Sequence, residues 1–240
     1  MSTAPAPRRV LAVIPAFNEA GKIGAVVRKI PRDVATGILV VDDGSTDATA
    51  AEAAEAGAEV LRHDRNRGVG AAIRSGIEHG RASGYDIVAV VAGDDQHDPT
   101  ELSAIVAPLV AGTADFVQGS RRLGGERANN IGMFRQVTTR VYTLLFRLAS
   151  GYPCTDATNG FRAFSLSIFD DRRIDTAQEW LDRYELEPYL FYKAVTTGKR
   201  VTEVPTTVFY HAAGTTKMKP VRDWWRILRP LVFLRLGIRR

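Results

Sequence analysis

The first half of this 240-residue chain alternates short runs rich in Val, Ile and Leu with longer stretches of helical pattern. Such alternation is typical of an α/β protein, in which right-handed helical crossovers join strands into a mostly parallel sheet. Strands buried on both faces read as continuous apolar runs, so we expect helices on both faces of this sheet. The expected strands are residues 10–14, 38–41, 59–62, 87–91 and 115–118, and the expected helices are residues 19–30, 47–56, 70–83 and 100–110.

After Gly119 the alternation gives way to a less regular pattern. Residues 121–132 are polar and Gly-rich, which predicts a mobile loop, and residues 134–148 have the spacing of an amphipathic helix. Residues 151–162 are polar and irregular. The remaining expected elements are a helix at residues 185–197, strands at 200–204 and 207–210, and a helical tail at about 221–236.

Length and composition suit one large domain with its own core, since 45% of the residues are hydrophobic and 25% are charged. We expect a disordered lead-in at residues 1–7, the α/β domain at 8–216 and a basic amphipathic tail at 217–240. The single cysteine, Cys154, excludes an internal disulfide and fits a cytosolic compartment. No apolar run is long enough to predict a membrane-spanning helix. Oligomeric state cannot be read from these features.

The basic charge of the chain is concentrated in the tail. Residues 217–240 hold eight Lys or Arg and one Asp, a net charge of +7, whereas the whole chain is +5 and the other 216 residues are therefore −2. A polyanionic partner must be sought at the tail. Because Trp and Leu alternate there with Arg, we expect contact with a membrane surface, and residues 214–219 just before could order around phosphate. The alternative is a helix packed on the core with its Arg side chains directed outward.

Polar side chains follow three of the expected strands. Asn18 and Glu19 follow the first strand, Asp42 and Asp43 follow the second, and residues 94–97 follow the fourth. Ligands of open parallel sheets bind beyond the carboxyl ends of the strands, so these groups should meet in one crevice.

Residues 88–99 carry the strongest chemical signal, a buried strand that ends in Asp94-Asp95-Gln96-His97-Asp98-Pro99. Hard oxygen ligands in such a turn suit Mg²⁺ or Mn²⁺, which bind one or two carboxylates together with substrate phosphates. The alternative is a polar turn in which Asp98 caps the next helix. His97 could contact a diphosphate or orient its neighbours, whereas His63, His79 and His211 are isolated in the sequence and favour surface or structural roles.

Residues 40–47 give a second signal, because adjacent carboxylates at a strand end repel each other and suit a site for a base or ribose. Thr46 or Asp47 could cap the following helix, but that role leaves Asp42 and Asp43 unexplained. The glycine loop at residues 66–72 lacks the third glycine of a dinucleotide fingerprint and is interpreted as a tight turn.

Taken together, these patterns resemble glycosyltransferase family 2, and most closely its dolichyl-phosphate mannosyltransferases and bacterial polyprenyl-phosphate glycosyltransferases. The resemblance covers about residues 8–210 and implies a glycosyltransferase A-type, Rossmann-like α/β fold with a C-terminal amphipathic helical tail. The residues that carry it are 14–19, 40–47, 66–72, 93–99, 119–121 and 156–162.

The resemblance also implies roles for particular residues. The donor nucleotide sugar would be bound by Pro15, Ala16, Glu19, Asp42, Asp43, Asp94 and Gln96. Asp94 and Gln96 would hold the metal, Mg²⁺ or Mn²⁺. Arg121 and Arg135 would bind the acceptor phosphate, with Thr139 one helical turn beyond Arg135. The catalytic set is then Asp94, Arg121 and Arg135.

One position departs from the family pattern. The usual metal motif is Asp-x-Asp, and Ala92 stands at its first position, so Asp95 or a water would have to substitute, or Asp94 and Gln96 would have to suffice. The acceptor phosphate is already anionic and needs no strong base, so catalysis would consist of positioning and charge neutralisation. The resemblance implies inversion at the sugar carbon in a single displacement.

The favoured function is transfer of mannose or glucose, for example from GDP-mannose, to a polyprenyl or dolichyl phosphate by a cytoplasmic enzyme peripheral to the cytoplasmic face of a membrane. Two alternatives stay open: a soluble acceptor, and a nucleotide-sugar- or lipid-binding protein that has lost turnover through Ala92. Nucleic-acid binding is not favoured, because no recognised motif accompanies the basic tail.

Overall fold

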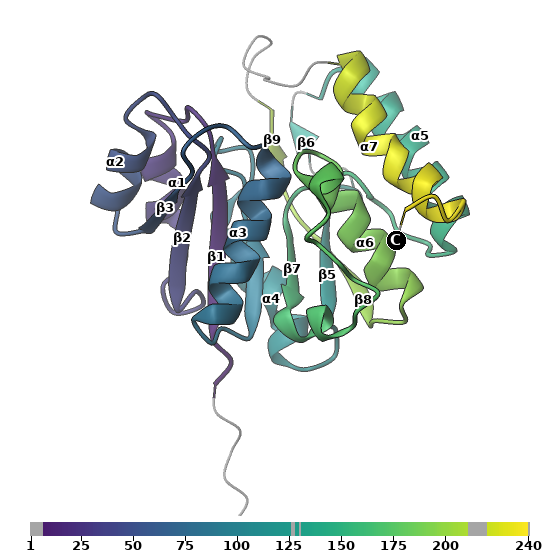
Figure 1. Cartoon of the computed structure of the whole chain (residues 1–240), viewed down its shortest axis with the longest axis horizontal. Helices are drawn as coiled ribbons and strands as arrows, with labels where there is room; N and C mark the ends of the chain where they lie inside the picture. Colours follow the sequence, from purple (N-terminus) through teal and green to yellow (C-terminus); the bar gives the residue numbers. More distant parts are fainter. Residues whose placement is uncertain (1–6, 126–127, 130, 211–219, 240) are drawn as a thin grey trace, which may run out of the picture.

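The computed structural model describes residues 7–125, 128–129, 131–210 and 220–239. Its centre is a seven-stranded sheet in the order β3-β2-β1-β4-β7-β5-β8 (Figure 1). All neighbouring strands are parallel except β7, which is antiparallel to β4 and β5. The strands are β1 (Val10–Ala16), β2 (Gly37–Asp42), β3 (Glu59–Arg62), β4 (Ile87–Val90), β5 (Phe116–Ser120), β7 (Arg162–Ser165) and β8 (Val201–Pro205).

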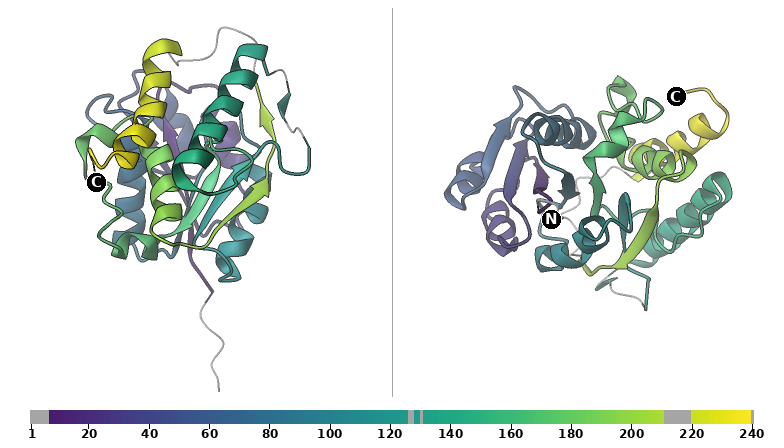
Figure 2. Two further views of the ribbon diagram at one scale, coloured as in Figure 1. Left: turned by 90° about the vertical axis from the view of Figure 1, so that its right-hand side faces the viewer. Right: turned by 90° about the horizontal axis from the view of Figure 1, so that it is seen from below.

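Seven helices cover this sheet in two layers among the described residues (Figure 2). On one face, α1 (Ile23–Lys29), α2 (Thr49–Glu55) and α4 (Leu102–Val110) bury their apolar side chains in one core. A second core on the other face holds side chains of the remaining four helices. These are α3 (Val69–Ala82), α5 (Met133–Ser150), α6 (Leu186–Thr196) and α7 (Pro220–Arg235).

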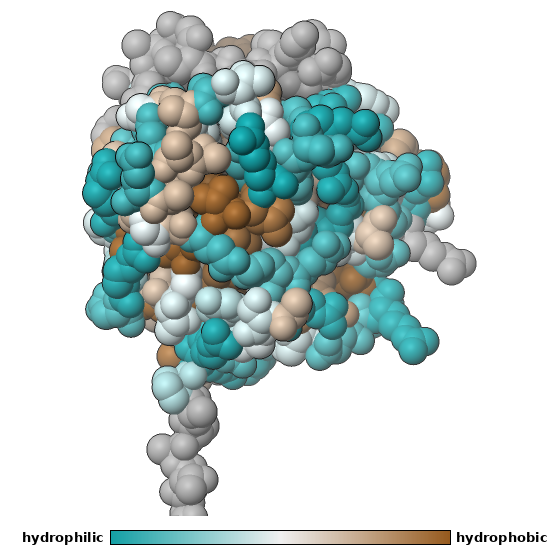
Figure 3. Space-filling model, turned by 60° about the vertical axis from the view of Figure 1, so that its left-hand side comes forward, coloured by the Kyte–Doolittle hydropathy of each residue, from teal (hydrophilic) through white to brown (hydrophobic). Residues whose placement is uncertain are grey.

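Successive residues of β1 explain why two cores form. Leu11 and Val13 belong to the core under α3, whereas Ala12 and Ile14 belong to the core under α1. This alternation follows from the two-residue period of a strand, and it requires apolar residues at every position. On the side of the molecule shown in Figure 3, hydrophilic residues cover most of the surface, and the largest hydrophobic area lies near the centre of the face. The α/β fold with helices on both faces is therefore confirmed.

The expected helix at residues 19–30 begins later than the sequence suggested, at Ile23. The backbone N–H groups of Asn18, Glu19 and Gly21 donate instead to side chains of the loop after β2 and of α2. Their acceptors are Ser45 Oγ, Thr49 Oγ1 and Glu52 Oε2, at 2.9, 2.8 and 2.7 Å. Asn18 and Gly21 both have positive φ angles, which helix geometry excludes. These bonds join the first two polar loops into one unit.

The second half contributes one strand to the main sheet that the sequence did not indicate. Residues 151–161 are irregular as expected, but Arg162 begins β7, which pairs with β4 and β5. Only Ala163 and Phe164 are apolar in this four-residue strand, too few to produce a recognisable pattern. Two further short strands pair with each other: β6 (Ala128–Asn129) lies in the expected loop region, and β9 (Val208–Phe209) lies within the expected strand at residues 207–210.

The tail forms α7 and lies against α5 and α6. Leu231 is buried, and Trp224, Ile227, Leu228 and Leu234 pack against the core, as the alternative interpretation of a packed helix requires. Other tail side chains are more than two-fifths exposed: Trp225, Val232, Leu236 and Ile238. None of the helices in the described ranges is long and apolar enough to span a membrane. The expectations for residues 1–6 and 211–219 fall outside the described ranges.

Candidate functional site

A cleft of about 560 Å³ opens at the carboxyl ends of β1 and β4, between α3 and α6. Seven of the ten predicted site residues line it: Pro15, Ala16, Glu19, Asp43, Asp94, Gln96 and Arg135. Parallel pairing brings them together, since Ala16 lies opposite Asp42 in the register of β1 and β2. Three predicted residues, Asp42, Arg121 and Thr139, lie outside the cleft wall.

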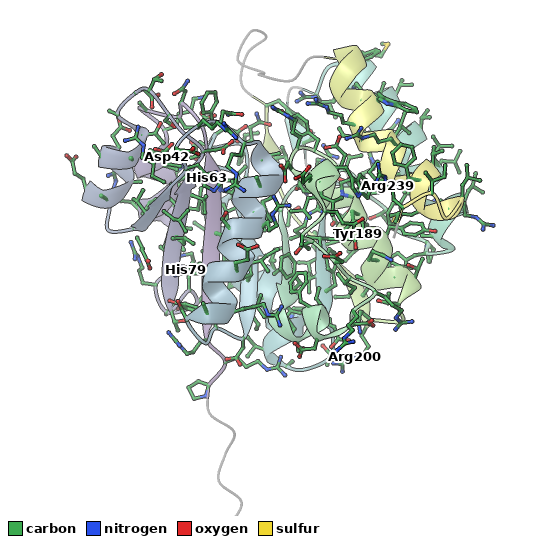
Figure 4. The ribbon with its side chains drawn as sticks, in the orientation of Figure 1. Asp42, His63, His79, Tyr189, Arg200 and Arg239 are labelled. Atoms are coloured by element: carbon green, nitrogen blue, oxygen red, sulfur yellow. The ribbon has the colours of Figure 1, made fainter. Side chains whose placement is uncertain are left out.

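The two aspartates that follow β2 hold the loops around the cleft. Asp42 is fully buried, accepts from Ser45 N at 2.9 Å and forms an ion pair with Arg62 at 3.2 Å. Asp42 and His63 lie close together at this end of the sheet, whereas Arg200 lies at the opposite end (Figure 4).

Asp43 is engaged in the same way but also borders the cleft. Its carboxylate accepts from Arg67 N and Gly68 N at 2.9 and 2.7 Å, and lies 2.7 Å from Nδ1 of His63. His63 is buried and its other nitrogen lies 3.0 Å from Ser75 Oγ, so the structural role expected for this histidine is confirmed. With these three partners, Asp43 fixes the wall against which a nucleoside would pack.

The glycine loop is a tight turn, as interpreted from the sequence, and it allows a close backbone contact. A Cβ at Gly68 would lie 2.4 Å from the carbonyl oxygen of Asp182, and one at Gly70 would lie 2.0 Å from that of Leu181. Ala71 N donates to Asp182 O at 2.8 Å. The start of α3 is thereby joined to the segment that precedes α6 and forms the far wall of the cleft.

The loop after β4 supplies Asp94 and Gln96. Asp94 Oδ1 accepts from Gln96 N at 3.2 Å. Burial raises the pKa of Asp94, and the neighbouring charge of Glu19 acts in the same direction. Asp98 accepts from Thr100 N at 3.0 Å, so the predicted capping role of Asp98 is confirmed.

His97 organises the same loop as a neutral group. Its Nδ1 accepts from Ala92 N at 3.3 Å, and its ring stacks on Phe161 with centroids 5.2 Å apart. Burial, together with the charges of Arg121 and Arg162, lowers the pKa of His97 to about 3. The histidine therefore orients the Ala92 backbone, although its ring also borders the cleft.

The donor set fits a divalent cation that takes most of its ligands from substrate. Across the described ranges, no three His, Cys, Asp or Glu side chains converge as a metal cage. Asp94 and Gln96 offer one carboxylate and one amide, the small contribution typical of Mg²⁺ sites that also use phosphates and water. A cation would also relieve the repulsion between Asp94 and Glu19. Asp95 is not placed to substitute for the missing first Asp, because it pairs with Lys29 at 2.8 Å and does not line the cleft.

Arg121 is held by a carboxylate that sequence reasoning did not single out. Its Nε and Nη2 donate to the two oxygens of Asp156 at 2.6 and 2.7 Å, and further N–H groups donate to Tyr210 and Thr158. Burial opposes the charged form, but the adjacent Asp156 outweighs it and raises the pKa of Arg121. Four of the five guanidinium hydrogens are therefore committed within the protein.

Arg135 and Thr139 lie one turn apart on α5, as predicted, but face different surroundings. Arg135 stacks over the ring of Tyr210 at 4.7 Å and borders the cleft. Thr139 is buried, and its hydroxyl accepts from Arg122 Nη2 at 2.7 Å. Of the three residues expected to bind the acceptor phosphate, Arg121 and Arg135 thus both contact Tyr210, Thr139 contacts Arg122, and only Arg135 lies on the cleft wall.

The wall opposite β1 was not predicted as part of the site. It consists of Arg183, Tyr184 and Glu187 before and within α6, and Arg226 of α7. Glu187 pairs with the buried Arg162 at 3.3 Å, and burial raises the pKa of Glu187. The available signal in the sequence is the acidic pair Glu185 and Glu187, although acidic residues at a helix start also serve simply to complement the helix dipole.

A mostly parallel α/β sheet with a cleft at its strand ends, and with carboxylate and amide side chains after β4, is the arrangement expected of a glycosyltransferase of the A type. The chain belongs to glycosyl transferase family 2, whose model matches residues 11–173. The family assignment made from the sequence is confirmed, and the protein is a glycosyltransferase.

Named relatives cover most of the chain. An undecaprenyl-phosphate mannosyltransferase of Micrococcus luteus is 32% identical, over 88% of this chain and 87% of its own. A UDP-N-acetylglucosamine–dolichyl-phosphate N-acetylglucosaminyltransferase of Methanococcus voltae is 26% identical, over 97% and 98%. Among solved structures, glucosyl-3-phosphoglycerate synthase of Mycobacterium tuberculosis, in complex with Mn²⁺, UDP-glucose and phosphoglyceric acid, shares the fold. Its TM-score is 0.67 at 21% identity, covering 97% of this chain and 81% of that one.

Proposed function

We propose that this protein transfers a hexose, with inversion, from a nucleotide sugar to a polyprenyl or dolichyl phosphate in a reaction that requires Mg²⁺ or Mn²⁺. The observation that carries the proposal is a single cleft that contains Asp94 and Gln96 at one wall and Arg135 of α5 at another. One wall suits a metal-bound diphosphate and the other suits a phosphate. Relatives named as undecaprenyl-phosphate and dolichyl-phosphate transferases support this acceptor class.

Each step assigns a role to residues of the cleft. The backbone around Pro15 and Ala16 and the fixed Asp43 would receive the nucleoside. Asp94 and Gln96 would hold the cation, which neutralises charge on the leaving diphosphate when bound. Arg135 would position the acceptor phosphate, whose anionic oxygen attacks the sugar carbon without a general base. The C–O bond to the diphosphate breaks as the new C–O bond forms, so the nucleoside diphosphate departs with its electron pair.

A membrane surface is the proposed location of the acceptor. On α5 the buried side chains are Thr139, Tyr142, Thr143 and Phe146, whereas most of its apolar side chains are exposed. The exposed apolar residues of α5 are Met133, Phe134, Val137, Val141, Leu144, Leu145 and Leu148. An apolar face this extensive, beside the basic α7, suits the interface of an anionic bilayer. We therefore place the enzyme at the cytoplasmic face of a membrane as a peripheral protein.

The test is transfer of radiolabelled sugar from GDP-mannose, UDP-glucose and UDP-N-acetylglucosamine, each with and without Mn²⁺ and a polyprenyl phosphate. We expect a lipid-linked product from one donor only when both metal and lipid are present. Donor hydrolysis without a lipid product would indicate a soluble acceptor. Donor binding without any turnover would overturn the proposal in favour of the inactive alternative.

A further inference from the structure

One arginine of the tail helix reaches the cleft. Arg226 of α7 lines it together with Asp94, Gln96 and Arg135, and its side chain is 23% exposed. The adjacent Trp225 is 55% exposed at the protein surface. Neighbouring helical positions point about 100° apart, so α7 presents one side chain to solvent and the next to the cleft.

A buried carboxylate holds this part of α7 in place. Glu185, which immediately precedes α6, is 1% exposed and lies 2.5 Å from Arg229 Nη2 and 3.9 Å from Arg226 Nε. A buried carboxylate is tolerated only when it is paired, so Glu185 favours one position of α7. Two residues close to Glu185 in the sequence, Tyr184 and Glu187, line the cleft. The same short segment therefore forms the wall and fixes the tail helix to it.

The charges in the cleft give Arg226 a function. The proposed reaction brings together a diphosphate and a phosphate, but Arg121 is compensated by Asp156 and does not border the cleft. Lys22 lies 3.5 Å from Glu19, which offsets part of its charge. Arg226 is a guanidinium on the wall, as are Arg135 and Arg183, and it differs from them in belonging to α7 and in lying 3.9 Å from the buried carboxylate of Glu185. A guanidinium is well suited to phosphate because of its planar set of donors.

We propose that Arg226 binds a phosphate group of the substrates in the cleft, and that Glu185 is its positioning residue. This inference rests on the proposed function and extends it, since it makes the C-terminal helix part of the substrate site in addition to any role at a membrane. The phosphate can belong to the donor diphosphate or to the acceptor, and the two sources predict different measurements.

The experiment compares Arg226→Ala and Arg226→Lys with Arg81→Ala, an exposed arginine that pairs with Asp170 away from the cleft. Acceptor is supplied in detergent micelles so that membrane docking does not contribute. Because a hydrogen bond to a charged group is lost, Arg226→Ala should lower kcat/KM by about 10- to 100-fold. Arg226→Lys should recover part of the loss, and Arg81→Ala should stay within about twofold of the wild type.

Two readouts distinguish the source of the phosphate. If Arg226 binds a phosphate of the donor, Arg226→Ala should weaken the binding of GDP or UDP with Mn²⁺, measured by calorimetry. If Arg226 binds the acceptor phosphate, the Kd of the nucleotide should be unchanged and the KM for polyprenyl phosphate should rise. An Arg226→Ala variant that matches Arg81→Ala in both readouts overturns the inference. Should the wild type fail to use polyprenyl phosphate, the proposed function fails, and the calorimetric comparison alone decides the inference.

Glu185→Gln tests the positioning role separately. Glu185→Gln should reproduce the change in KM or Kd that Arg226→Ala causes. The double variant should show little further change in KM or Kd, because the two residues act together in binding phosphate. Lower thermal stability with unchanged KM and Kd would show that Glu185 has only a structural role and would overturn its assignment as a positioning residue.

Discussion

At the scale of single residues, the buried pair of Arg121 and Asp156 raises the question of whether an arginine beside the cleft stabilises the fold or binds substrate. Asp156 also accepts from Thr158 N at 3.1 Å and lies 3.9 Å from Arg122, so it is the centre of the network beside the cleft. Removing a partner from a buried ion pair leaves an uncompensated charge. A loss of activity in an Arg121 variant would therefore need to be read together with its stability.

We expect Arg121→Ala to lower the free energy of unfolding by about 3–5 kcal/mol, because Asp156 would be left charged and buried. Urea unfolding at neutral pH measures this change. A combined Arg121→Ala and Asp156→Asn variant should recover much of the loss. If the free energy of unfolding of Arg121→Ala equals that of the wild type, the pair is solvated by water in solution and the prediction is wrong.

The same pair predicts a pH dependence. Burial alone would raise the pKa of Asp156, but the charge and hydrogen bonds of Arg121 outweigh burial and lower it. A carboxyl group whose pKa is lower in the folded state stabilises the fold above its unfolded pKa and loses that contribution as pH falls through the folded value. Asp156→Asn should therefore flatten the stability profile below about pH 4, the ordinary range of Asp. Unfolding curves of both proteins across that range provide the comparison.

Ala92 leads to a second prediction at this scale. It borders the cleft beside Asp94, so Ala92→Asp adds a carboxylate where the cation is expected. We expect the Mn²⁺ concentration for half-maximal transfer to fall by about tenfold, since affinity follows the number of charged ligands. Repulsion from Asp94 and Glu19 should make the metal-free variant less stable than the wild type.

The control for this prediction is Asp94→Asn, which should lose transfer by about 100-fold or more because charge neutralisation is lost. Its stability should not fall, since burial disfavours the charged form of Asp94. An Ala92→Asp protein with unchanged metal dependence would show that Asp94 and Gln96 already saturate the protein's share of the ligands.

At the scale of elements, α5 is unusual because it buries only Thr139, Tyr142, Thr143 and Phe146, whereas seven of its apolar side chains are exposed. Leu144 and Leu148 are 54% and 72% exposed, so their replacement by Glu should leave the free energy of unfolding nearly unchanged. Binding to vesicles that contain anionic lipid should weaken by about tenfold or more per substitution, because each leucine contributes roughly 1.5–3 kcal/mol when buried. Vesicle sedimentation measures the binding, and equal binding by the double variant would exclude α5 from the contact.

The elements also show what the sequence could and could not predict. Apolar runs located β1, β2 and β4, and four of the polar residues after them line the cleft (Glu19, Asp43, Asp94 and Gln96), because a parallel sheet gathers its strand ends on one edge. The late start of α1 was not predictable, since its cause is a set of hydrogen bonds that backbone N–H groups of residues 18–21 donate to side chains of residues 45–52. The wall formed by Arg183 and Arg226 was missed for the same reason: these residues meet β1 only through tertiary packing.

At the scale of the whole molecule, the cleft, α5 and α7 have a common orientation. The carboxyl ends of the parallel strands point to the same end of the molecule at which α5 and α7 begin (Figure 1). Docking through the exposed faces of these helices would bring Arg135 and Arg226 near the level of lipid phosphates. The charge distribution supports this orientation, because the tail carries +7 and the rest of the chain −2.

This arrangement predicts that salt affects lipid-embedded and soluble acceptors differently. Attraction of the tail to an anionic bilayer is screened as the Debye length falls from about 10 to 3 Å between about 0.1 and 1 M salt. The KM for polyprenyl phosphate in anionic vesicles should therefore rise steeply over this range. The KM for a short-chain, water-soluble phosphate acceptor should change less, because salt then affects only the contacts in the cleft. The KM for polyprenyl phosphate in vesicles without anionic lipid should show the same smaller change. Equal salt dependence with all three acceptors would mean that α5 and α7 meet a partner other than the bilayer, and that the acceptor reaches Arg135 without surface docking.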